Sequence, residues 1–338
     1  MQIEKYRRAV SVWLLFVAGM VLGMIVVGGL TRLTQSGLSM VEWRPLMGTI
    51  PPITEAEWNE VFEKYKAYPE YQKLNQGMEL SAFKSIFYFE YGHRMLGRVI
   101  GMVFAFPALF FGFKKAFPAS MIPKMILLFF LGGAQGLIGW WMVKSGLVDR
   151  PDVSHYRLTT HLGMAVSLYI ALLWIALKHR KGNITRGETQ GVKMATFLLG
   201  LVFFVLLSGG LVAGLNAGHM MNTFPLMNGQ IIPNGIWVAE NGFLNLTENR
   251  ITLQFNHRYL ALGTASLIIG FWFWLRKNGL SARQKLASHV MLIAVIVQVS
   301  LGITTLLTRV WIPAASLHQT GAVLLISSLV WLNVELRS

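Results

Sequence analysis

Apolar residues gather in long runs along this chain, and short polar segments separate the runs. A helix needs about 20 apolar residues to cross the hydrocarbon core of a bilayer. Runs of about that length lie at 9–30, 86–113, 121–143, 158–177, 194–215, 255–275, 286–307 and 314–334. The pattern therefore predicts an all-α polytopic membrane protein with eight transmembrane helices.

Composition supports this class. Hydrophobic residues make up 54% of the 338 residues and charged residues only 13%, whereas soluble domains carry about a quarter charged residues. Cysteine is absent, which excludes disulfides, thiolate metal ligands and cysteine nucleophiles. The 8 histidines are therefore the main candidates for binding a soft metal.

The net charge of +15 is distributed as in a membrane protein and does not indicate nucleic-acid binding. Lys and Arg concentrate at 5–8, 114–124, 178–193 and 276–285, and by the positive-inside rule both termini are expected in the cytoplasm. The long segments 31–85 and 216–254 are then outside. The first run has no small-residue cleavage site, and no Arg- and Ser-rich presequence precedes it. These features indicate a retained helix in a bacterial plasma (inner) membrane.

The first outer segment contains TEAEWNEVFEKYKAYPEYQKL, in which apolar residues recur at helical spacing among charges. We expect an amphipathic helix that caps the outer face. An equally good alternative is a solvated loop helix without a chemical role.

The two halves of the sequence repeat each other. His93-Arg94 is matched by His257-Arg258, and Gln135-Gly136 in the third run corresponds to Gln298 in the seventh; His161 corresponds to His318. Each half starts inside and contains four spans, so the repeat is parallel. We expect two four-helix bundles related by a pseudo-twofold axis, with halves at residues 1–178 and 179–338.

Four histidines are expected at one depth. His93, His161, His257 and His318 each lie near the outer end of a span, and ionisable side chains inside a membrane are functional by default. Two imidazoles on facing helices are what six-coordinate heme iron requires, whereas zinc or copper would need further ligands nearby. The sequence thus predicts one heme site per half. The other histidines are expected in outer loops (His155, His219) or near the cytoplasmic face (His179, His289), without a direct role.

Charged neighbours distinguish the two sites. Arg94 and Arg258 follow the first histidine of each pair, and we expect Arg258 to pair with a heme propionate. Glu90 lies one helical turn before His93, whereas the equivalent residue before His257 is Gln254, which cannot titrate. The difference suggests chemistry in the N-terminal half. The alternative is an ion pair between Glu90 and Arg94, four residues apart.

Five blocks in order resemble the heme A synthase family, specifically its cysteine-free branch from mitochondria and Gram-negative bacteria: GGLTRLTQSGLSM, FEYGHRMLGR, DVSHYRLTTHLG, GGLVAGLNAGHMMNTFP and LHQTGA. The resemblance covers nearly the whole chain. It implies an oxidoreductase that converts the methyl group at position 8 of heme O to a formyl group, making heme A for cytochrome oxidase.

The resemblance also implies residue roles. His93 and His161 match the pair that holds the substrate heme, and Glu90 matches the family's glutamate. His257 and His318 match the pair that holds a permanent heme b. Expected partners are heme O, the heme O synthase, an electron acceptor and the lipid bilayer.

Two other functions use some of the same features. A diheme b-type electron-transfer cytochrome would employ the same four histidines but would not need Glu90. A transporter built on a parallel repeat would explain the eight helices but not the histidines at one depth. For the enzyme, the sequence leaves open whether the added oxygen comes from water or from dioxygen.

Overall fold

The computed structural model describes residues 2–42, 48–148, 151–182 and 189–338. In these ranges the regular structure is helical, and a single β-bridge joins Met227 to Gln230. Eight helices are long and apolar enough to cross a membrane, which confirms the eight predicted spans, with boundaries that differ by at most seven residues. They are α1 (Gln2–Leu33), α4 (Leu80–Phe113), α5 (Ile122–Gly146), α6 (His155–Lys181), α7 (Gln190–Gly214), α9 (Arg250–Arg276), α10 (Ala282–Leu307) and α11 (Ile312–Leu336).

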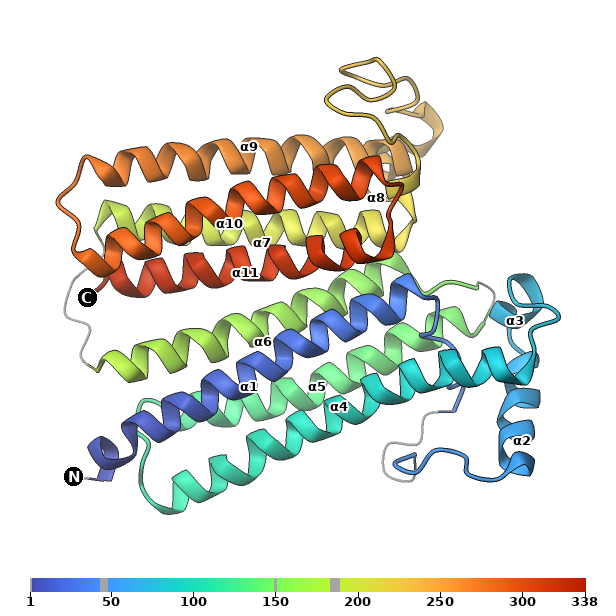
Figure 1. Ribbon diagram of the computed structural model, residues 1–338, viewed down its shortest axis with the longest axis horizontal. Coiled ribbons are helices and arrows are strands. Elements are labelled where there is room, and N and C mark those ends of the chain that lie inside the picture. The colour runs from blue at the N-terminus through green and yellow to red at the C-terminus, as the bar shows by residue number, and fades with distance from the viewer. Residues whose placement is uncertain (1, 43–47, 149–150, 183–188) are drawn as a thin grey trace.

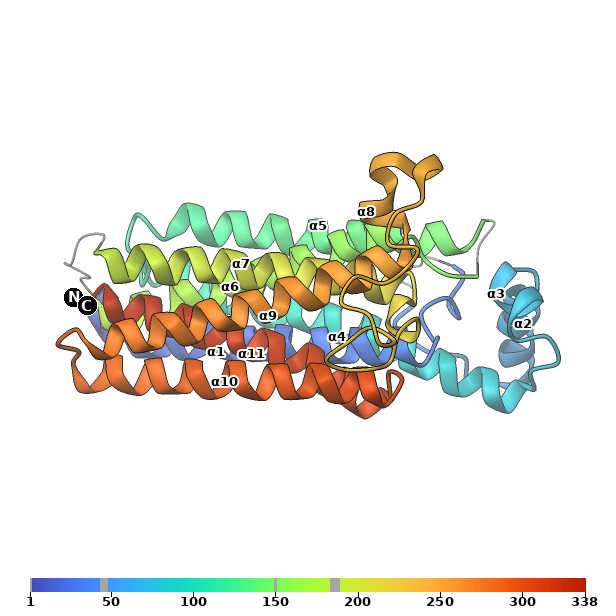
Figure 2. The same cartoon turned by 90° about the horizontal axis from the view of Figure 1, so that it is seen from above.

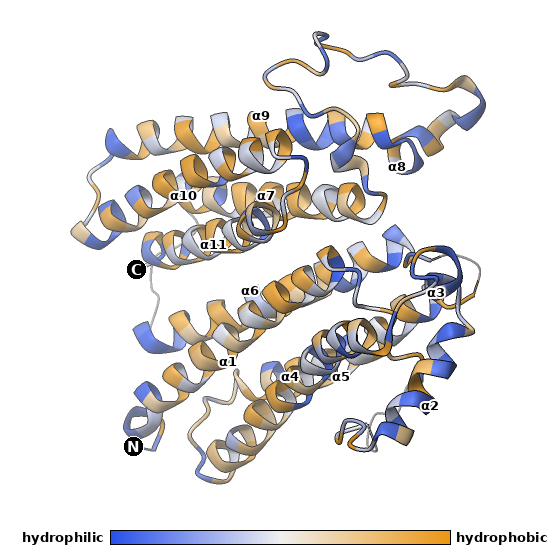
Figure 3. Ribbon diagram, turned by 45° about the vertical axis from the view of Figure 1, so that its right-hand side comes forward, coloured by the Kyte–Doolittle hydropathy of each residue, from blue (hydrophilic) through white to orange (hydrophobic). Residues whose placement is uncertain are grey.

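The outward faces of these helices are apolar. Phe106, Phe130, Phe204 and Ile293 are each between 59% and 67% exposed, and hydrophobic residues cover the helices along most of their length (Figure 3). Exposure of so much apolar surface to water would be unfavourable. Lipid chains cover it without cost, so the molecule is a multi-pass membrane protein.

The helices form two neighbouring groups (Figure 1). One group contains α1, α4, α5 and α6, and the other contains α7, α9, α10 and α11. Contacts of α6 with α7 and α11, and of α1 with α11, join the groups. Both chain ends lie at the same end of the molecule (Figure 2), as an even number of spans requires. The pseudo-twofold axis, the division at residues 178 and 179, and the cytoplasmic location of the termini stay predictions. Residues 183–188 of the basic cluster at 178–193 lie outside the described part.

The first outer segment contains the expected amphipathic helix. It is α2 (Glu55–Lys66), which begins with a capping box between Thr54 and Glu57 and is followed by the short helix α3 (Pro69–Lys73). Trp58 and Phe62 pack against aromatic residues at the start of α4. Helix α4 begins six residues before the predicted boundary and carries α2 and α3 beyond the ends of the other helices (Figure 1). The segment therefore caps the end of α4 that lies away from the chain termini.

The second outer segment is mostly irregular. It contains the 3₁₀ helices η1 (Ala217–His219) and η2 (Ala239–Leu244) and the single turn α8 (Asn245–Glu248). The Asn249 side chain caps the first turn of α9 by accepting hydrogen bonds from two backbone N–H groups. This segment therefore fixes where α9 begins, seven residues before His257.

Candidate functional site

All four predicted histidines line one cavity of about 1860 Å³. His93 lies on α4 and His161 on α6, while His257 lies on α9 and His318 on α11. Within each half, the two imidazoles are close enough to interact electrostatically. Tertiary packing therefore brings together each pair that the sequence predicted. A cavity of this size exceeds the roughly 300–1,000 Å³ of a typical small-molecule pocket and has room for two large ligands.

A glycine on a neighbouring helix adjoins each imidazole. A methyl group built on any of these glycines would come within about 3 Å of the ring, so a larger residue would displace the histidine. The first histidine of each half meets the Gly-Gly-Leu motif, and the second meets a glycine four residues after a glutamine. The four pairs are Gly28 with His93 (3.1 Å), Gly139 with His161 (3.0 Å), Gly209 with His257 (3.0 Å) and Gly302 with His318 (2.8 Å).

Those two glutamines hold the second histidine of each half. The Gln135 side-chain amide donates to the backbone carbonyl of His161 at 2.9 Å, and Gln298 donates to the carbonyl of His318 at 3.0 Å. The repeat seen in sequence thus recurs as the same hydrogen bond in both halves. Each bond fixes one turn of a histidine-bearing helix against its neighbour.

The polar atoms around these pairs fit a heme. Three buried atoms near the pairs have no hydrogen-bond partner among the described residues. They are Nδ1 of His161 and the side-chain oxygens of Gln135 and Gln298. Buried polar atoms normally have partners. Among the described residues, no three His, Asp or Glu side chains gather in a metal-binding cluster. Paired imidazoles without a third ligand suit axial coordination of a porphyrin iron.

Glu90 lies in the N-terminal half of the cavity and is only 3% exposed. Its Oε1 accepts hydrogen bonds from two nitrogens of Arg94 at 2.5 and 3.1 Å. Its Oε2 accepts from the Ser39 hydroxyl and from the Met40 backbone N–H, both at 2.7 Å. The ion pair considered as the alternative role of Glu90 is therefore present. The same carboxylate also fastens the segment that follows α1 to helix α4.

The C-terminal half has the same arrangement with an amide in place of the carboxylate. Gln254 accepts from the Met221 backbone N–H at 3.1 Å and donates to the Met221 carbonyl at 3.1 Å. Arg258 is 8% exposed and donates to the carbonyls of Met221, Leu226 and Pro225 at 3.2 to 3.5 Å. No ion pair of Arg258 with a carboxylate occurs in the described part of the chain. Its charge is thus available to an anion in the cavity.

The two fastened segments share a backbone conformation. Gln35 and Asn216 occupy the same place after Gly28 and Gly209, and their φ angles are 51° and 54°. Left-handed backbone is uncommon outside glycine. Its recurrence at matched positions shows that the segments leaving α1 and α7 turn in the same way, and this supports the predicted repeat.

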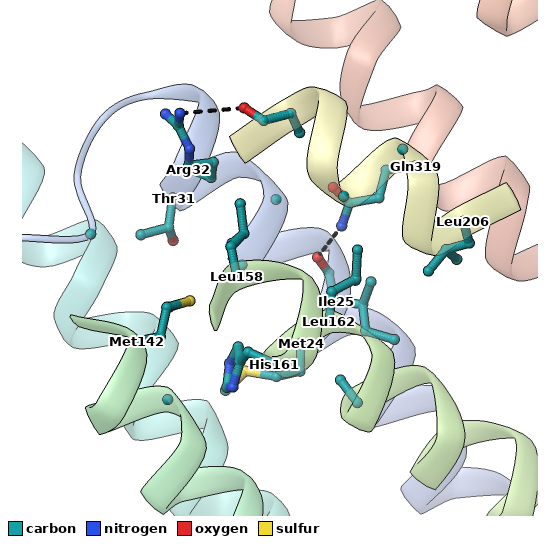
Figure 4. Close-up of a pocket in the computed structure, with 18 of the residues that line it drawn as sticks. Met24, Ile25, Thr31, Arg32, Met142, Leu158, His161, Leu162, Leu206 and Gln319 are labelled. Atoms are coloured by element: carbon teal, nitrogen blue, oxygen red, sulfur yellow. Dashed lines mark hydrogen bonds between the residues drawn. The ribbon is translucent and has the colours of Figure 1, made fainter. Parts of the chain in front are cut away.

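Sequence reasoning missed two side chains that connect the halves at the level of the histidines (Figure 4). Arg32, at the end of α1, donates to Asn216 Oδ1 at 3.1 Å, and Gln319 on α11 donates to the carbonyl of Ile25 at 2.7 Å. Each residue lies inside one of the blocks that resemble the family, but the sequence offered no signal that these blocks would meet across the halves.

The expectation for His155 is wrong, and that for His219 is incomplete. His155 is the first residue of α6 and is 2% exposed, because its Cβ packs against Gly214 of α7. It lies 3.6 Å from the Glu248 carboxylate. His219 does lie in the outer segment, in η1, but it lines the cavity. The expectation that both histidines lie in outer loops did not include the packing of these segments on the helix ends.

These features define a class: a multi-pass membrane protein in which two pairs of histidines from four helices line one large cavity. Comparison with known proteins identifies the family. The family model described as cytochrome oxidase assembly protein matches residues 11–330, and the chain belongs to this family. It is 47% identical to the heme A synthase of Nitrosospira multiformis, over 98% of this chain and 94% of that protein. It is 45% identical to the heme A synthase of Nitrosomonas eutropha, over 95% and 92%, and 45% identical to that of Rhodospirillum centenum, over 96% and 87%. The predicted family resemblance is confirmed.

Proposed function

We propose that this chain is a heme A synthase, an oxidoreductase that converts the C8 methyl group of heme O to a formyl group and so supplies heme A for cytochrome oxidase. The observation that carries the proposal is the near full-length similarity to proteins of that name, in a chain whose paired histidines line one large cavity. The chain would act in a bacterial inner membrane, with both termini in the cytoplasm and the heme sites near the outer face.

The N-terminal half would hold the substrate, with His93 and His161 as ligands of the heme O iron. Conversion of a methyl group to a formyl group removes four electrons and adds one oxygen. Glu90 adjoins this site, and hydrogen-bond donors occupy both of its oxygens. A carboxylate so placed is better suited to stabilising positive charge that develops on the substrate than to accepting a proton. Between proton acceptance and charge stabilisation, the contacts of Glu90 therefore favour charge stabilisation.

The C-terminal half would hold heme b between His257 and His318. Bound there, heme b would supply one-electron transfer between the substrate site and an external acceptor. Ser208 lies 2.7 Å from Nδ1 of His257 and Gln298 lies 3.2 Å from Nδ1 of His318, so each ring is oriented by a neighbour. Arg258 would pair with a propionate. The heme O synthase would be the source of the substrate.

The test is pigment analysis. The chain is expressed with a heme O source in a host that lacks heme A, and extracted hemes are identified by mass. We expect heme A from the wild type, and heme O without heme A from His93→Ala or His161→Ala. The control is His289→Ala, which changes an exposed histidine at the other end of the molecule. Pigmented protein that binds heme but never yields a formyl product would instead indicate a diheme electron-transfer cytochrome.

A further inference from the structure

A second buried carboxyl group lies at the outer end of the N-terminal site. Glu70 belongs to α3 and is only 3% exposed, although α3 is at the outer surface. It lines the same cavity as His93 and Glu90. Its Oε2 accepts a hydrogen bond of 2.9 Å from the hydroxyl of Tyr65, which in turn accepts one of 2.7 Å from the Asn75 amide. Tyr65 is fully buried and Asn75 is partly exposed, so this chain of hydrogen bonds leads from the cavity wall into the outer segment.

Glu70 differs from Glu90 in how it is satisfied. Four donors bind the Glu90 carboxylate. Among the described residues only Tyr65 donates to Glu70, and no cation forms an ion pair with it. One of its oxygens is thus available to take up a proton. Burial of a carboxyl group without a cation favours its neutral form.

The titratable groups that face Glu70 come from four elements. The charged groups are Glu90 on α4, Asp152 in the segment before α6 and Arg32 on α1, and the fourth group is the neutral phenol of Tyr65 on α2. Burial raises the pKa of Glu70 from 4.5 to about 7, and the charges of Glu90 and Asp152 act in the same direction. The Tyr65 hydrogen bond and the Arg32 charge lower the pKa but do not offset burial. At neutral pH this carboxyl group therefore exchanges its proton readily.

The position of Glu70 is specific to the half that is proposed to perform chemistry. In the described part of the chain, the carboxyl groups that line the cavity are Glu70, Glu90 and Asp152. All three belong to the N-terminal half. The outer segment of the C-terminal half contributes Asn216, Gly218, His219, Phe224 and Gln254 to the cavity but no carboxyl group. A segment whose only role was to cover the helix ends would not need a buried acid facing the cavity.

We propose that Glu70 is the proton-exit group of the N-terminal site. Its carboxylate takes up a proton from the cavity and releases it to water at the outer surface, which returns Glu70 to its ionised state. The inference rests on the proposed function, because oxidation of a methyl group releases protons that an apolar cavity cannot hold. It gives the outer segment a function: α2 and α3 hold this carboxyl group between the substrate and the outside.

Three variants test the proposal. Glu70→Gln removes the titrating group and keeps its size, and Tyr65→Phe removes the hydrogen bond that lowers the Glu70 pKa. The matched control is Glu63→Gln, an exposed residue of the same segment that pairs with Lys66. The rate of heme A formation is measured between pH 5.5 and pH 9 in purified protein supplied with heme O and an external electron acceptor. The protonated carboxyl band is followed by infrared spectroscopy over the same range.

In the wild type we expect the rate to rise as the pH increases through about 7, because Glu70 accepts protons only when ionised, and the infrared band to disappear over the same interval. Glu70→Gln should lack both the infrared band and the rise in rate near pH 7, and its rate at pH 8 should be at least several-fold below that of the wild type. Tyr65→Phe should shift both features to higher pH. Glu63→Gln should match the wild type.

Two results would overturn the proposal. One is a Glu70→Gln protein with the wild-type pH profile. The other is a Glu70→Gln protein whose rate falls equally at every pH while the rise in rate near pH 7 persists, which would indicate a structural role. A wild-type protein that forms no heme A would instead overturn the proposed function, and the inference with it. The infrared titration does not depend on turnover, so the two failures can be distinguished.

Discussion

The Glu90 carboxylate accepts a hydrogen bond of 2.7 Å from the backbone N–H of Met40, which belongs to the segment that leaves α1. In the other half, Gln254 accepts the equivalent bond from Met221 at 3.1 Å. The uncharged side-chain amide of Gln254 therefore holds the segment that leaves α7 in the way that the Glu90 carboxylate holds the segment that leaves α1. Both halves need a hydrogen-bond acceptor for this backbone N–H, but a carboxylate supplies it only in the half where a substrate is proposed to react.

This relationship makes Glu90→Gln a sharp test. The variant should keep the Met40 contact, as Gln254 does for Met221, and should fold and retain heme b. Heme A formation should fall by about 100-fold, the typical effect of removing an electrostatic group from an active site, and heme O or a hydroxymethyl intermediate should accumulate. Mass analysis of extracted hemes measures both. The reciprocal change Gln254→Glu is the control, and near-normal heme A from Glu90→Gln would leave the carboxylate as a structural partner of Arg94.

His257→Ala and His318→Ala should each remove heme b, because loss of one axial nitrogen destroys paired coordination. We expect retained heme b to fall at least about tenfold, a loss comparable to that caused by weakening a metal site. Heme content and the low-spin spectrum of purified protein are the measurements. A full b-type spectrum from either variant would place the ligands elsewhere.

Gly302→Ala should disturb the same site without changing a ligand. The added methyl group would lie 2.8 Å from Cε1 of His318, and overpacking of this kind costs about 1–3 kcal/mol. The spectrum should shift or weaken as the ring is displaced. Gly270→Ala, on α9, is the matched control because nothing lies within 4 Å of its added methyl group. Equal spectra from both variants would refute the close contact.

Arg258→Ala should lower the midpoint potential of heme b, because removal of a nearby positive charge favours the oxidised form. A shift on the order of tens of millivolts is expected, given that about 59 mV corresponds to a tenfold change for a one-electron couple. Axial ligation should persist in the spectrum. Redox titration measures the shift, with Arg276→Ala at the far end of the same helix as control. An unchanged potential and heme content would show that Arg258 serves only the carbonyls of its outer segment.

The outer segment should loosen as pH rises. The folded pKa of Glu70 is about 7 and the ordinary value is 4.5, so its contribution to stability is full below pH 4.5 and is lost as the pH rises to about 7. The difference corresponds to about 3 kcal/mol. Hydrogen exchange of α2 and α3, corrected for the intrinsic rate, should show more frequent opening at pH 7 than at pH 4.5. Glu70→Gln should abolish this dependence, and an unaltered dependence would contradict the assignment.

Local periodicity predicted much of this protein. Spans follow from the length of apolar runs, because a helix of given rise must cross a bilayer of given thickness. The neighbourhood of Glu90, His93 and Arg94 follows from their spacing on one helix. The amphipathic helix α2 was visible for the same reason. These features depend only on residues a few positions apart.

Contacts between distant segments were decided by tertiary structure alone. Sequence indicated an ion pair for Glu90 but not its bonds to Ser39 and Met40. It showed glycines in each half but not that they would meet the imidazoles. It placed Glu70 in an amphipathic segment and offered no reason to expect it to be buried. Such contacts depend on how helices pack and how outer segments fold back over them, and packing is set by the shapes of many side chains together. The composition and spacing of the chain therefore determined its class and its paired histidines, whereas the packing of its helices decided which groups surround those histidines.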